Sequence, residues 1–159
     1  MLTLREGNWG FDSGTLRYPR VSSCLTLSVI NGGIIYGMHG IIIPSGNQWS
    51  ISQLILKMKN FKTIQQDAKL IIACDFGTWG RDGRQLPING QTTRVTDFTT
   101  LADYLGIARG GATISGKGQF GNVTLVDVAE GSDFFKTKSQ SAYFLVNING
   151  TVQGTEAIS

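Results

Sequence analysis

A turn signal between two β-prone runs is the feature that most constrains what this chain can fold into. Residues 25–30 (LTLSVI) and 34–38 (IIYGM) flank the tripeptide Asn31-Gly32-Gly33. Asn-Gly between such runs is the strongest short-range signal for a β-hairpin, because both residues tolerate the positive φ angles of a two-residue turn. We therefore predict a hairpin whose loop consists of Asn31 and Gly32.

This turn fixes which residues face one another across the hairpin. Counting back from Ile30 and forward from Gly33, Cys24 falls directly opposite His39, the only histidine of the chain. Directly opposed residues share a face of the sheet, with Cβ atoms about 4.5–5.5 Å apart. The same register places an apolar set of side chains on the other face, namely Leu25, Leu27 and Val29 against Met38, Tyr36 and Ile34.

A thiol beside an imidazole has a specific chemical use. The imidazole takes the thiol proton as a base and, once protonated, stabilises the thiolate, which is the nucleophilic form of cysteine. Ser22 and Ser23 precede Cys24, and small side chains at these positions leave room for a bulky substrate. The alternative is that Cys24 is a buried thiol that packs as a small apolar residue, and that His39 is a structural histidine.

The two segments also resemble a known family. Residues 21–26 (VSSCLT) and 35–40 (IYGMHG) are similar to the nucleophile and base segments of glutamine deamidases of the cytotoxic necrotizing factor type, and of their relative, the chemotaxis deamidase CheD. Ser23 stands where these enzymes usually have glycine, and Ile43-Pro44 is only faintly similar to the Leu-Pro of CheD. The match favours the toxin-like branch over the chemotaxis enzyme.

The resemblance implies hydrolysis of a side-chain carboxamide on a protein, which converts glutamine or asparagine to the acid and releases ammonia. Cys24 would attack the amide carbon, and His39 would accept the thiol proton and donate it to the departing ammonia. Backbone N–H groups near Ser22 and Ser23 would hold the oxyanion and the substrate. In this family a backbone carbonyl, or a threonine shortly before the cysteine, can orient the histidine. Tyr18 occupies the comparable position here, and its carbonyl could do the same.

Two carboxylates and the second cysteine complete the candidates. Asp12 and Asp75 remain alternative groups that could orient His39. Cys74 lies in a buried-strand pattern, residues 69–76, where a cysteine packs as an apolar side chain rather than forming a disulfide. One histidine and two widely spaced cysteines do not make a ligand cluster, so we expect no metal and no other cofactor.

Length and composition favour one domain with many turns. The chain has 159 residues, of which 41% are hydrophobic and only 16% charged, with 21 glycines and 3 prolines. This composition is typical of a compact, β-rich protein. We predict a single catalytic domain over residues 1–159 of the α+β class, with a β-sandwich-like mixed-sheet core and one or two flanking helices. The expected strands are 2–6, 14–18, 24–30, 34–43, 69–76, 123–128 and 142–148, the expected helices begin after Ser50 and near Phe98, and a polar tail follows Asn149-Gly150.

No segment resembles a secretory signal or a membrane span. The first residues lack a basic region followed by a long apolar one, and no apolar run approaches the roughly eighteen residues that a spanning helix needs. We expect a soluble bacterial effector or toxin, secreted without a classical signal peptide and active in the reducing cytosol of a target cell. Its partners would be a protein substrate that bears the target glutamine or asparagine, and an immunity or chaperone protein, but no membrane.

The net charge of +3 raises the question of a nucleic-acid ligand. Arg81, Arg84 and Arg94 lie near Trp79 in the sequence, and single-strand binders combine cations and aromatics in this way. The other basic residues are scattered, so we interpret residues 77–85 as a solvated loop and expect no nucleic-acid partner. These arginines, with Arg17 and Arg20, could equally steer an acidic protein toward the site.

Two other functions stay open at this point. A non-enzymatic β-sandwich module could bind a protein or a glycan through Trp79 and the glycine-rich loop at 110–121, which lacks the spacing of a phosphate loop. Cys24 and His39 would then be structural. The other alternative keeps the pair but uses it in a thiol protease or a transglutaminase. The accessibility of Cys24 separates the first alternative from the deamidase, and the reaction product separates the second.

Overall fold

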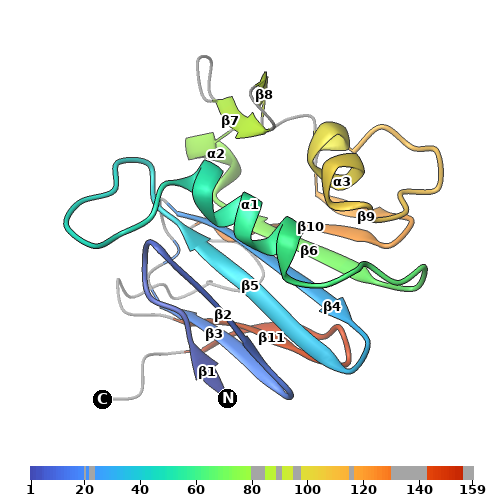
Figure 1. The fold of residues 1–159 in the computed structure, drawn as a ribbon, viewed down its shortest axis with the longest axis horizontal. Coiled ribbons are helices and arrows are strands. Elements are labelled where there is room, and N and C mark those ends of the chain that lie inside the picture. Colours follow the sequence, from blue (N-terminus) through green and yellow to red (C-terminus); the bar gives the residue numbers. More distant parts are fainter. Residues whose placement is uncertain are drawn as a thin grey trace.

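The strands that the structure describes form two mixed sheets and a separate hairpin (Figure 1). A computed structural model describes residues 1–19, 21, 24–79, 85–88, 91–94, 98–114, 117–129 and 143–155. The large sheet has the order β2 (Asn8–Asp12), β5 (Ile34–Gly40), β4 (Leu25–Asn31), β6 (Lys69–Cys74), β10 (Val123–Asp127) and β9 (Gly118–Phe120). The small sheet has the order β1 (Leu2–Thr3), β3 (Thr15–Pro19), β11 (Tyr143–Asn147) and β12 (Val152–Thr155). The hairpin pairs β7 (Gln85–Ile88) with β8 (Gln91–Arg94).

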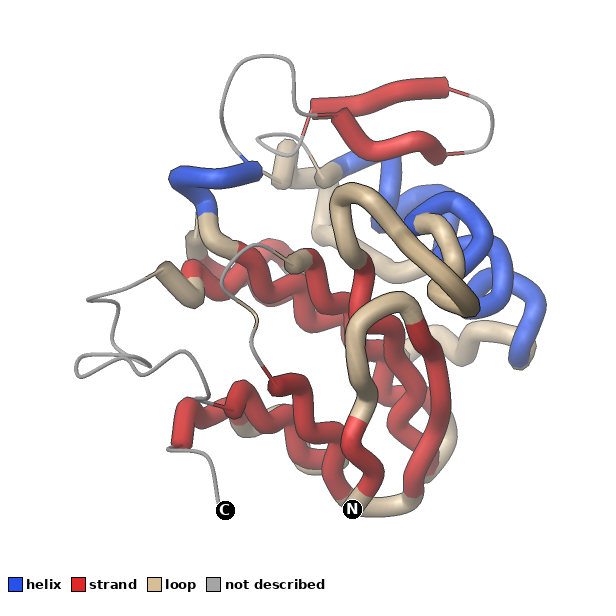
Figure 2. The backbone as a smooth tube through the Cα atoms, turned by 90° about the vertical axis from the view of Figure 1, so that its left-hand side faces the viewer, coloured by secondary structure: helices blue, strands red, loops and turns tan. Residues whose placement is uncertain are grey.

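The described residues form three layers. The helices α1 (Ile51–Phe61) and α3 (Thr99–Leu105) pack on one face of the large sheet, and the small sheet packs on its other face (Figure 2). A single-turn helix, α2 (Phe76–Trp79), follows β6. The predicted α+β class with a sandwich-like core is therefore confirmed. Within the described residues, no helix is long and apolar enough to cross a lipid bilayer.

Alternation along β4 explains why both faces of the large sheet are buried. Leu25, Leu27 and Val29 belong to the core beneath the helices. Between them, Thr26 and Ser28 point to the opposite face, where the small sheet covers them, and both side chains are completely buried. A strand covered on both faces has no solvent side, so its polar residues need partners inside the protein.

The helices α1 and α3 begin where the sequence predicts. Ser50 caps α1 through a capping box, in which its hydroxyl accepts from the N–H of Gln53 (3.3 Å) and the Gln53 side chain accepts from the N–H of Ser50 (2.9 Å). Gly106 ends α3 in the left-handed conformation, with φ of 78°. The helices expected after Ser50 and near Phe98 are confirmed.

Several strand boundaries differ from the expectation. Strand β2 (NWGFD) was not predicted; at Gly10 a Cβ would approach the end of the Leu2 side chain on the covering strand β1. Strand β5 ends at Gly40, three residues before the expected end, and Ile43 is 79% exposed rather than buried. Strand β12 occupies part of the expected polar tail, because an edge strand exposed to solvent can be polar.

Candidate active site

The predicted hairpin is present, but its register is shifted by one residue on each strand. Gly32 and Gly33 form the loop, with φ of 62° and 80°, and Asn31 stays in β4 opposite Ile34. The side chain of Asn31 explains the shift, because it donates to the carbonyl of Thr63 (3.0 Å) and accepts from the N–H of Gln65 (3.1 Å). These bonds hold Asn31 at the end of the strand and leave the turn to the two glycines.

The observed register therefore changes the relation of Cys24 to His39. Thr26, not Cys24, lies directly opposite His39, and Leu25 lies opposite Gly40. The prediction that Cys24 directly faces His39 is wrong. Cys24 directly precedes β4 and lies outside the paired ladder, which ends at Leu25 opposite Gly40. If the alternation of β4 is continued by one residue, Cys24 falls on the face of Thr26 and His39, one pair beyond Thr26.

His39 is completely buried and is held by one strong hydrogen bond. Its Nδ1 lies 2.8 Å from the carbonyl oxygen of Leu4. A carbonyl only accepts, so Nδ1 carries the proton and Nε2 is left with its lone pair. Nε2 has no hydrogen-bond partner among the described residues. Burial lowers the pKa of His39 to about 4, against an opposing effect of the Leu4 hydrogen bond, and keeps the ring neutral at neutral pH.

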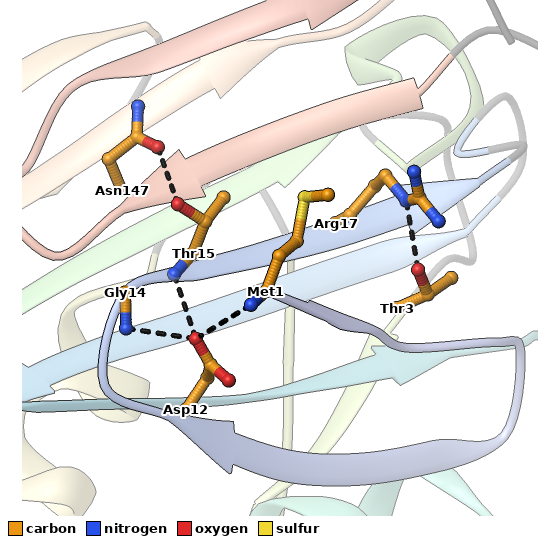
Figure 3. A network of polar contacts seen from close by, with 7 residues as sticks. All are labelled: Met1, Thr3, Asp12, Gly14, Thr15, Arg17 and Asn147. Carbon is orange, nitrogen blue, oxygen red and sulfur yellow. Dashed lines mark hydrogen bonds and ion pairs between the residues drawn. The ribbon is translucent and has the colours of Figure 1, made fainter. Parts of the chain in front are cut away.

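The carbonyl of Leu4 is brought to His39 by the short strand β1. Leu2 and Thr3 pair with β3 in parallel, and the N–H of Leu4 continues the ladder with a bond to the carbonyl of Arg17 (2.8 Å). The side chain of Arg17 also donates from Nε to the hydroxyl of Thr3 (2.8 Å), as Figure 3 shows. Backbone pairing and this side-chain contact together position the group that orients the imidazole.

Tyr18 lies beside His39. Contrary to the expectation from the sequence, it does not orient the imidazole through its carbonyl. Its ring meets the imidazole edge-on, with centroids 5.7 Å apart and an interplanar angle of 81°. The Tyr18 hydroxyl donates to the carbonyl of Leu27 (3.2 Å) and is hydrogen-bonded to Ser28 Oγ (2.7 Å). Burial raises the pKa of Tyr18, partly offset by the Ser28 hydrogen bond, so the phenol stays protonated. Tyr18 packs against the imidazole and supplies no second hydrogen bond to it.

Gly37 leaves space for the hydroxyl of Tyr18. A Cβ at this position would overlap Tyr18 Oη and would lie 2.7 Å from the carbonyl oxygen of Leu27 and 2.8 Å from Leu16 Cδ1. Gly37 lies opposite Ser28 on β4, on the same sheet face as His39. The absence of a side chain on β5 is what lets the Tyr18 hydroxyl reach Ser28.

Neither carboxylate alternative orients the histidine. Asp12 accepts from the N–H groups of Gly14 (2.9 Å) and Thr15 (3.0 Å), and these bonds hold the pKa of its carboxyl below the usual value. Its oxygen also lies 3.5 Å from the amino group of Met1, as drawn in Figure 3. Asp75 accepts from the N–H of Gly77 (2.8 Å) at the start of α2. Both carboxylates therefore accept hydrogen bonds from backbone N–H groups two or three residues further along the chain.

The two cysteines are buried to a similar degree but lie in different surroundings. Cys24 is 1% exposed and Cys74 is completely buried, and neither forms a disulfide. Cys74 belongs to the apolar core beneath the helices, as predicted, and burial together with Asp127 and Asp75 raises the pKa of its thiol. The candidate oxyanion residues Ser22 and Ser23 lie outside the described residues.

Trp79 does not lie in an exposed loop, as we expected for residues 77–85. Trp79 closes α2, is 2% exposed and belongs to the core, so it cannot serve as an exposed binding anchor. Arg81 and Arg84 lie outside the described residues, as does Arg20. Arg17 lies over the ring of Tyr143, 4.6 Å from the ring centroid.

The glycine-rich segment ends, at Gly121, in a tight turn that packs against the backbone of residues 108 and 109. Gly121, with φ of 59°, leads from β9 into β10, and a side chain there would collide with the backbone of Arg109. The N–H of Asn122 then donates to the carbonyl of Ala108 (2.8 Å). Among the residues that the structure describes, no group of histidine, cysteine and carboxylate side chains could hold a metal ion.

Sequence reasoning missed Leu4, which accepts the hydrogen bond of the His39 ring, and Thr26, which lies opposite His39 on β4. Leu4 contributes only its carbonyl, which every residue possesses, so no residue type could have indicated it. Thr26 was visible, since a hydroxyl on the cysteine face of the predicted strand is a polar residue in a buried position. Its hydroxyl donates to the carbonyl of Ala73 (3.1 Å) on β6.

Comparison with known proteins does not assign this chain to a family. No protein-family model matches the sequence, and no curated protein matches it either. The chemistry of Cys24 and His39 therefore has to be inferred from their geometry and from the properties of the two side chains.

Proposed function

We propose that this chain is a protein deamidase that uses Cys24 as nucleophile and His39 as general base on the side-chain amide of a glutamine or asparagine. The proposal is supported above all by the state of His39. Its Nδ1 proton is committed to Leu4, and its Nε2 lone pair has no partner among the described residues. A neutral imidazole with a free Nε2 is the form that accepts a proton from a thiol.

The proposed reaction has two stages. In the first, the Cys24 thiol gives its proton to Nε2 of His39, and the sulfur attacks the amide carbon and forms a tetrahedral intermediate. The carbon–nitrogen bond then breaks, His39 returns the proton to the nitrogen, and ammonia leaves a thioester on Cys24. In the second stage, water loses a proton to His39 and attacks the thioester, which releases the acid and restores the thiol.

The exclusion of water affects the proton transfer from Cys24 to His39 in two opposite ways. Burial lowers the pKa of His39 and therefore opposes formation of the imidazolium. A thiolate produced in the same step places a negative charge beside that imidazolium, and the interaction between opposite charges is strongest where water is excluded. In the proposed step this attraction offsets part of the cost of burying the two charges, so the proton transfer depends on the thiolate and the imidazolium forming together.

The test measures the thiol and the product separately. Brief treatment with iodoacetamide, followed by mass spectrometry of peptides, gives the alkylation rate of Cys24 in the wild type and in His39→Ala. Cytosolic extracts of cultured mammalian and bacterial cells are then incubated with wild type and with Cys24→Ala, and peptides are searched for glutamine or asparagine converted to the acid. We expect fast alkylation of Cys24 that needs His39, and conversion that needs Cys24. Equal alkylation of Cys24 in both proteins, with no Cys24-dependent conversion, would overturn the proposal.

The burial of both side chains favours a second candidate, a non-enzymatic module in which Cys24 and His39 are structural. Cys24 is 1% exposed and His39 is completely buried. In that case Cys24 would resist iodoacetamide in the folded protein and react only after unfolding. The Trp79 surface considered from the sequence cannot be its binding site, because Trp79 is buried.

A further inference from the structure

Strand β2 is the outermost strand of the large sheet, and its outer edge has no partner among the described strands. Figure 1 shows it along the margin of the sheet, beyond β5. With five residues, it is the longest edge strand in the described part of the chain. Proteins usually protect a sheet edge with lysine, proline, a bulge or a very short strand. The sequence NWGFD contains neither lysine nor proline, and its pairing with β5 is uninterrupted.

The main-chain groups of β2 alternate between β5 and the open edge. The N–H of Asn8 donates to the carbonyl of Arg5 (3.2 Å), so it is not paired with β5. Main-chain groups of successive strand residues point to opposite sides, and those of every second residue point the same way. Gly10 and Asp12 therefore turn their N–H and C=O groups outward, as Asn8 does. The outer edge carries these groups at the spacing of a β-ladder.

An aromatic cluster supports β2 on the side of the helices. The ring of Phe61, the last residue of α1, lies 5.2 Å from that of Trp9 and 5.0 Å from that of Phe11, measured between centroids. Tyr36 on β5 also lies 5.0 Å from Phe61. Tyr36 is completely buried, whereas Phe11 is 52% exposed. The cluster therefore holds a partly exposed aromatic ring in a fixed place beside the open edge, and aromatic rings are enriched in protein interfaces.

The residue types along β2 read the same in both directions: polar, aromatic, glycine, aromatic, polar. If two copies pair antiparallel with Gly10 opposite Gly10, Trp9 of one copy lies opposite Phe11 of the other. In this register Gly10 is a hydrogen-bonded position, so the two aromatic pairs occupy non-hydrogen-bonded positions, where side chains approach most closely. Asn8 lies opposite Asp12 of the other copy, so an amide that donates faces a carboxylate that accepts.

We propose that β2 pairs with β2 of a second copy of this chain, so that the two large sheets join into one continuous sheet across a two-fold axis at Gly10. A second copy fits this edge because the strand is complementary to itself, and a two-fold axis makes each contact twice. Each aromatic ring meets an aromatic ring, and each polar side chain meets a polar one. The pairing does not depend on the proposed deamidase function.

The test measures association and its location separately in the intact chain. Sedimentation velocity between about 1 μM and about 1 mM, the range in which small interfaces associate, gives the dissociation constant of the dimer. Phe11→Lys places a charge at the open edge, and Leu56→Lys makes the same change on α1, where Leu56 is 49% exposed. Hydrogen exchange at low and high protein concentration, read by mass spectrometry with residue-level fragmentation, locates the contact. Thermal melting checks that each variant is folded.

We expect the wild type and Leu56→Lys to dimerise equally, and Phe11→Lys to raise the dissociation constant by about tenfold or more, the usual cost of losing an aromatic anchor. Phe11→Tyr should still dimerise. The amides of Gly10 and Asp12 should become protected as the concentration rises. The amide of Trp9, which faces β5, should be protected at both concentrations.

Asn8→Asp provides a second variant that leaves the aromatic cluster intact. It sets two carboxylates opposite each other in each polar pair, so it should also weaken the dimer, and it keeps the result decisive if Phe11→Lys does not fold. A chain that is monomeric over the whole concentration range would overturn the proposal. So would a dimer that Phe11→Lys and Asn8→Asp leave unchanged, or one that does not protect the amides of Gly10 and Asp12.

Discussion

The Nδ1 proton of His39 is donated to the carbonyl oxygen of Leu4, a residue of the N-terminal segment, at 2.8 Å. This bond decides which imidazole nitrogen can act as a base, because only Nε2 keeps a lone pair. In many nucleophilic enzymes a carboxylate takes this role. Here a neutral carbonyl does so, and it orients the ring without adding a negative charge that would raise its pKa. The position of β1 is therefore part of the candidate chemistry.

Loss of the Thr3 hydroxyl should loosen this arrangement. Thr3→Val removes the acceptor for Arg17 Nε at nearly constant volume, and one hydrogen bond of this kind contributes about 0.5–1.5 kcal/mol to the free energy of unfolding. We expect a small loss of stability and a slower alkylation of Cys24, because β1 then holds the Leu4 carbonyl less firmly. The control is Thr151→Val, which removes a hydroxyl that donates to Asn149 (2.7 Å) and accepts from Asn147 (2.9 Å) in the turn between β11 and β12 of the small sheet. Equal alkylation rates in the two variants would contradict the role of β1.

Acid should destabilise the protein through His39. Its pKa is about 4 in the folded chain, below the ordinary value of 6.5. Between these values the unfolded chain binds more protons, so the free energy of unfolding falls as the pH is lowered from 6.5 toward 4 and is unaffected by this group above 6.5. The full effect is roughly 3 kcal/mol. Urea unfolding at pH 4, 5, 6 and 7 measures it. In His39→Gln the part of the pH dependence that belongs to this residue should disappear, and a variant with the same profile as the wild type would refute the assignment.

The two cysteines should respond oppositely to substitution. Cys24→Ser and Cys24→Ala should abolish deamidation, whereas Cys74→Ala should keep it and lower the free energy of unfolding by about 1 kcal/mol, because a buried thiol in an apolar core loses packing when truncated. Activity and thermal melting are measured on the same preparations. A Cys74→Ala protein that is stable but inactive would reverse the assignment of the nucleophile.

Gly37 should tolerate a side chain only if Tyr18 gives way. Gly37→Ala places a Cβ against the Tyr18 hydroxyl, and overpacking of this kind costs about 1–3 kcal/mol. Tyr18→Phe removes the obstructing oxygen, so the double variant should be less destabilised than the sum of the two single ones. Relief should be incomplete, because Leu27 and Leu16 also lie close to the new Cβ. Urea unfolding of the four proteins gives the coupling, and simple additivity would show that the hydroxyl does not occupy the space above Gly37.

The hairpin shows how far sequence reasoning reaches in this protein. Its existence and its two strands follow from local patterns, since turn chemistry and alternation act over a few residues. Its register does not, because Asn31 is held in the strand by Thr63 and Gln65. Those partners follow α1 in the chain, and no local pattern reports them.

The residue that orients His39, in contrast, could not be predicted from local sequence patterns. The family resemblance indicated a backbone carbonyl as one possibility, but not which residue supplies it. Leu4 owes its role to the parallel pairing of β1 with β3 and to the packing of the small sheet on the large one. Tyr18 was selected by its position in the sequence and does lie against the imidazole, although through its ring. Side-chain identity could suggest the neighbour of His39, and only the fold reveals the carbonyl.

The two-glycine turn between β4 and β5 also has a consequence for the order of folding. A hairpin with so short a loop forms within about 1–10 μs, because little entropy is lost in closing it. The parallel pairing of β6 with β10 needs a crossover from Cys74 to Val123 that includes α2, β7, β8 and α3, and such non-local contacts form late. His39 and Thr26, which lies two residues after Cys24, are thus paired by the most local unit of the large sheet. Leu4 can orient the imidazole only when β1 is paired with β3 and the small sheet lies against the large one, so the tautomer of the base depends on the docking of the two sheets and not on the hairpin alone.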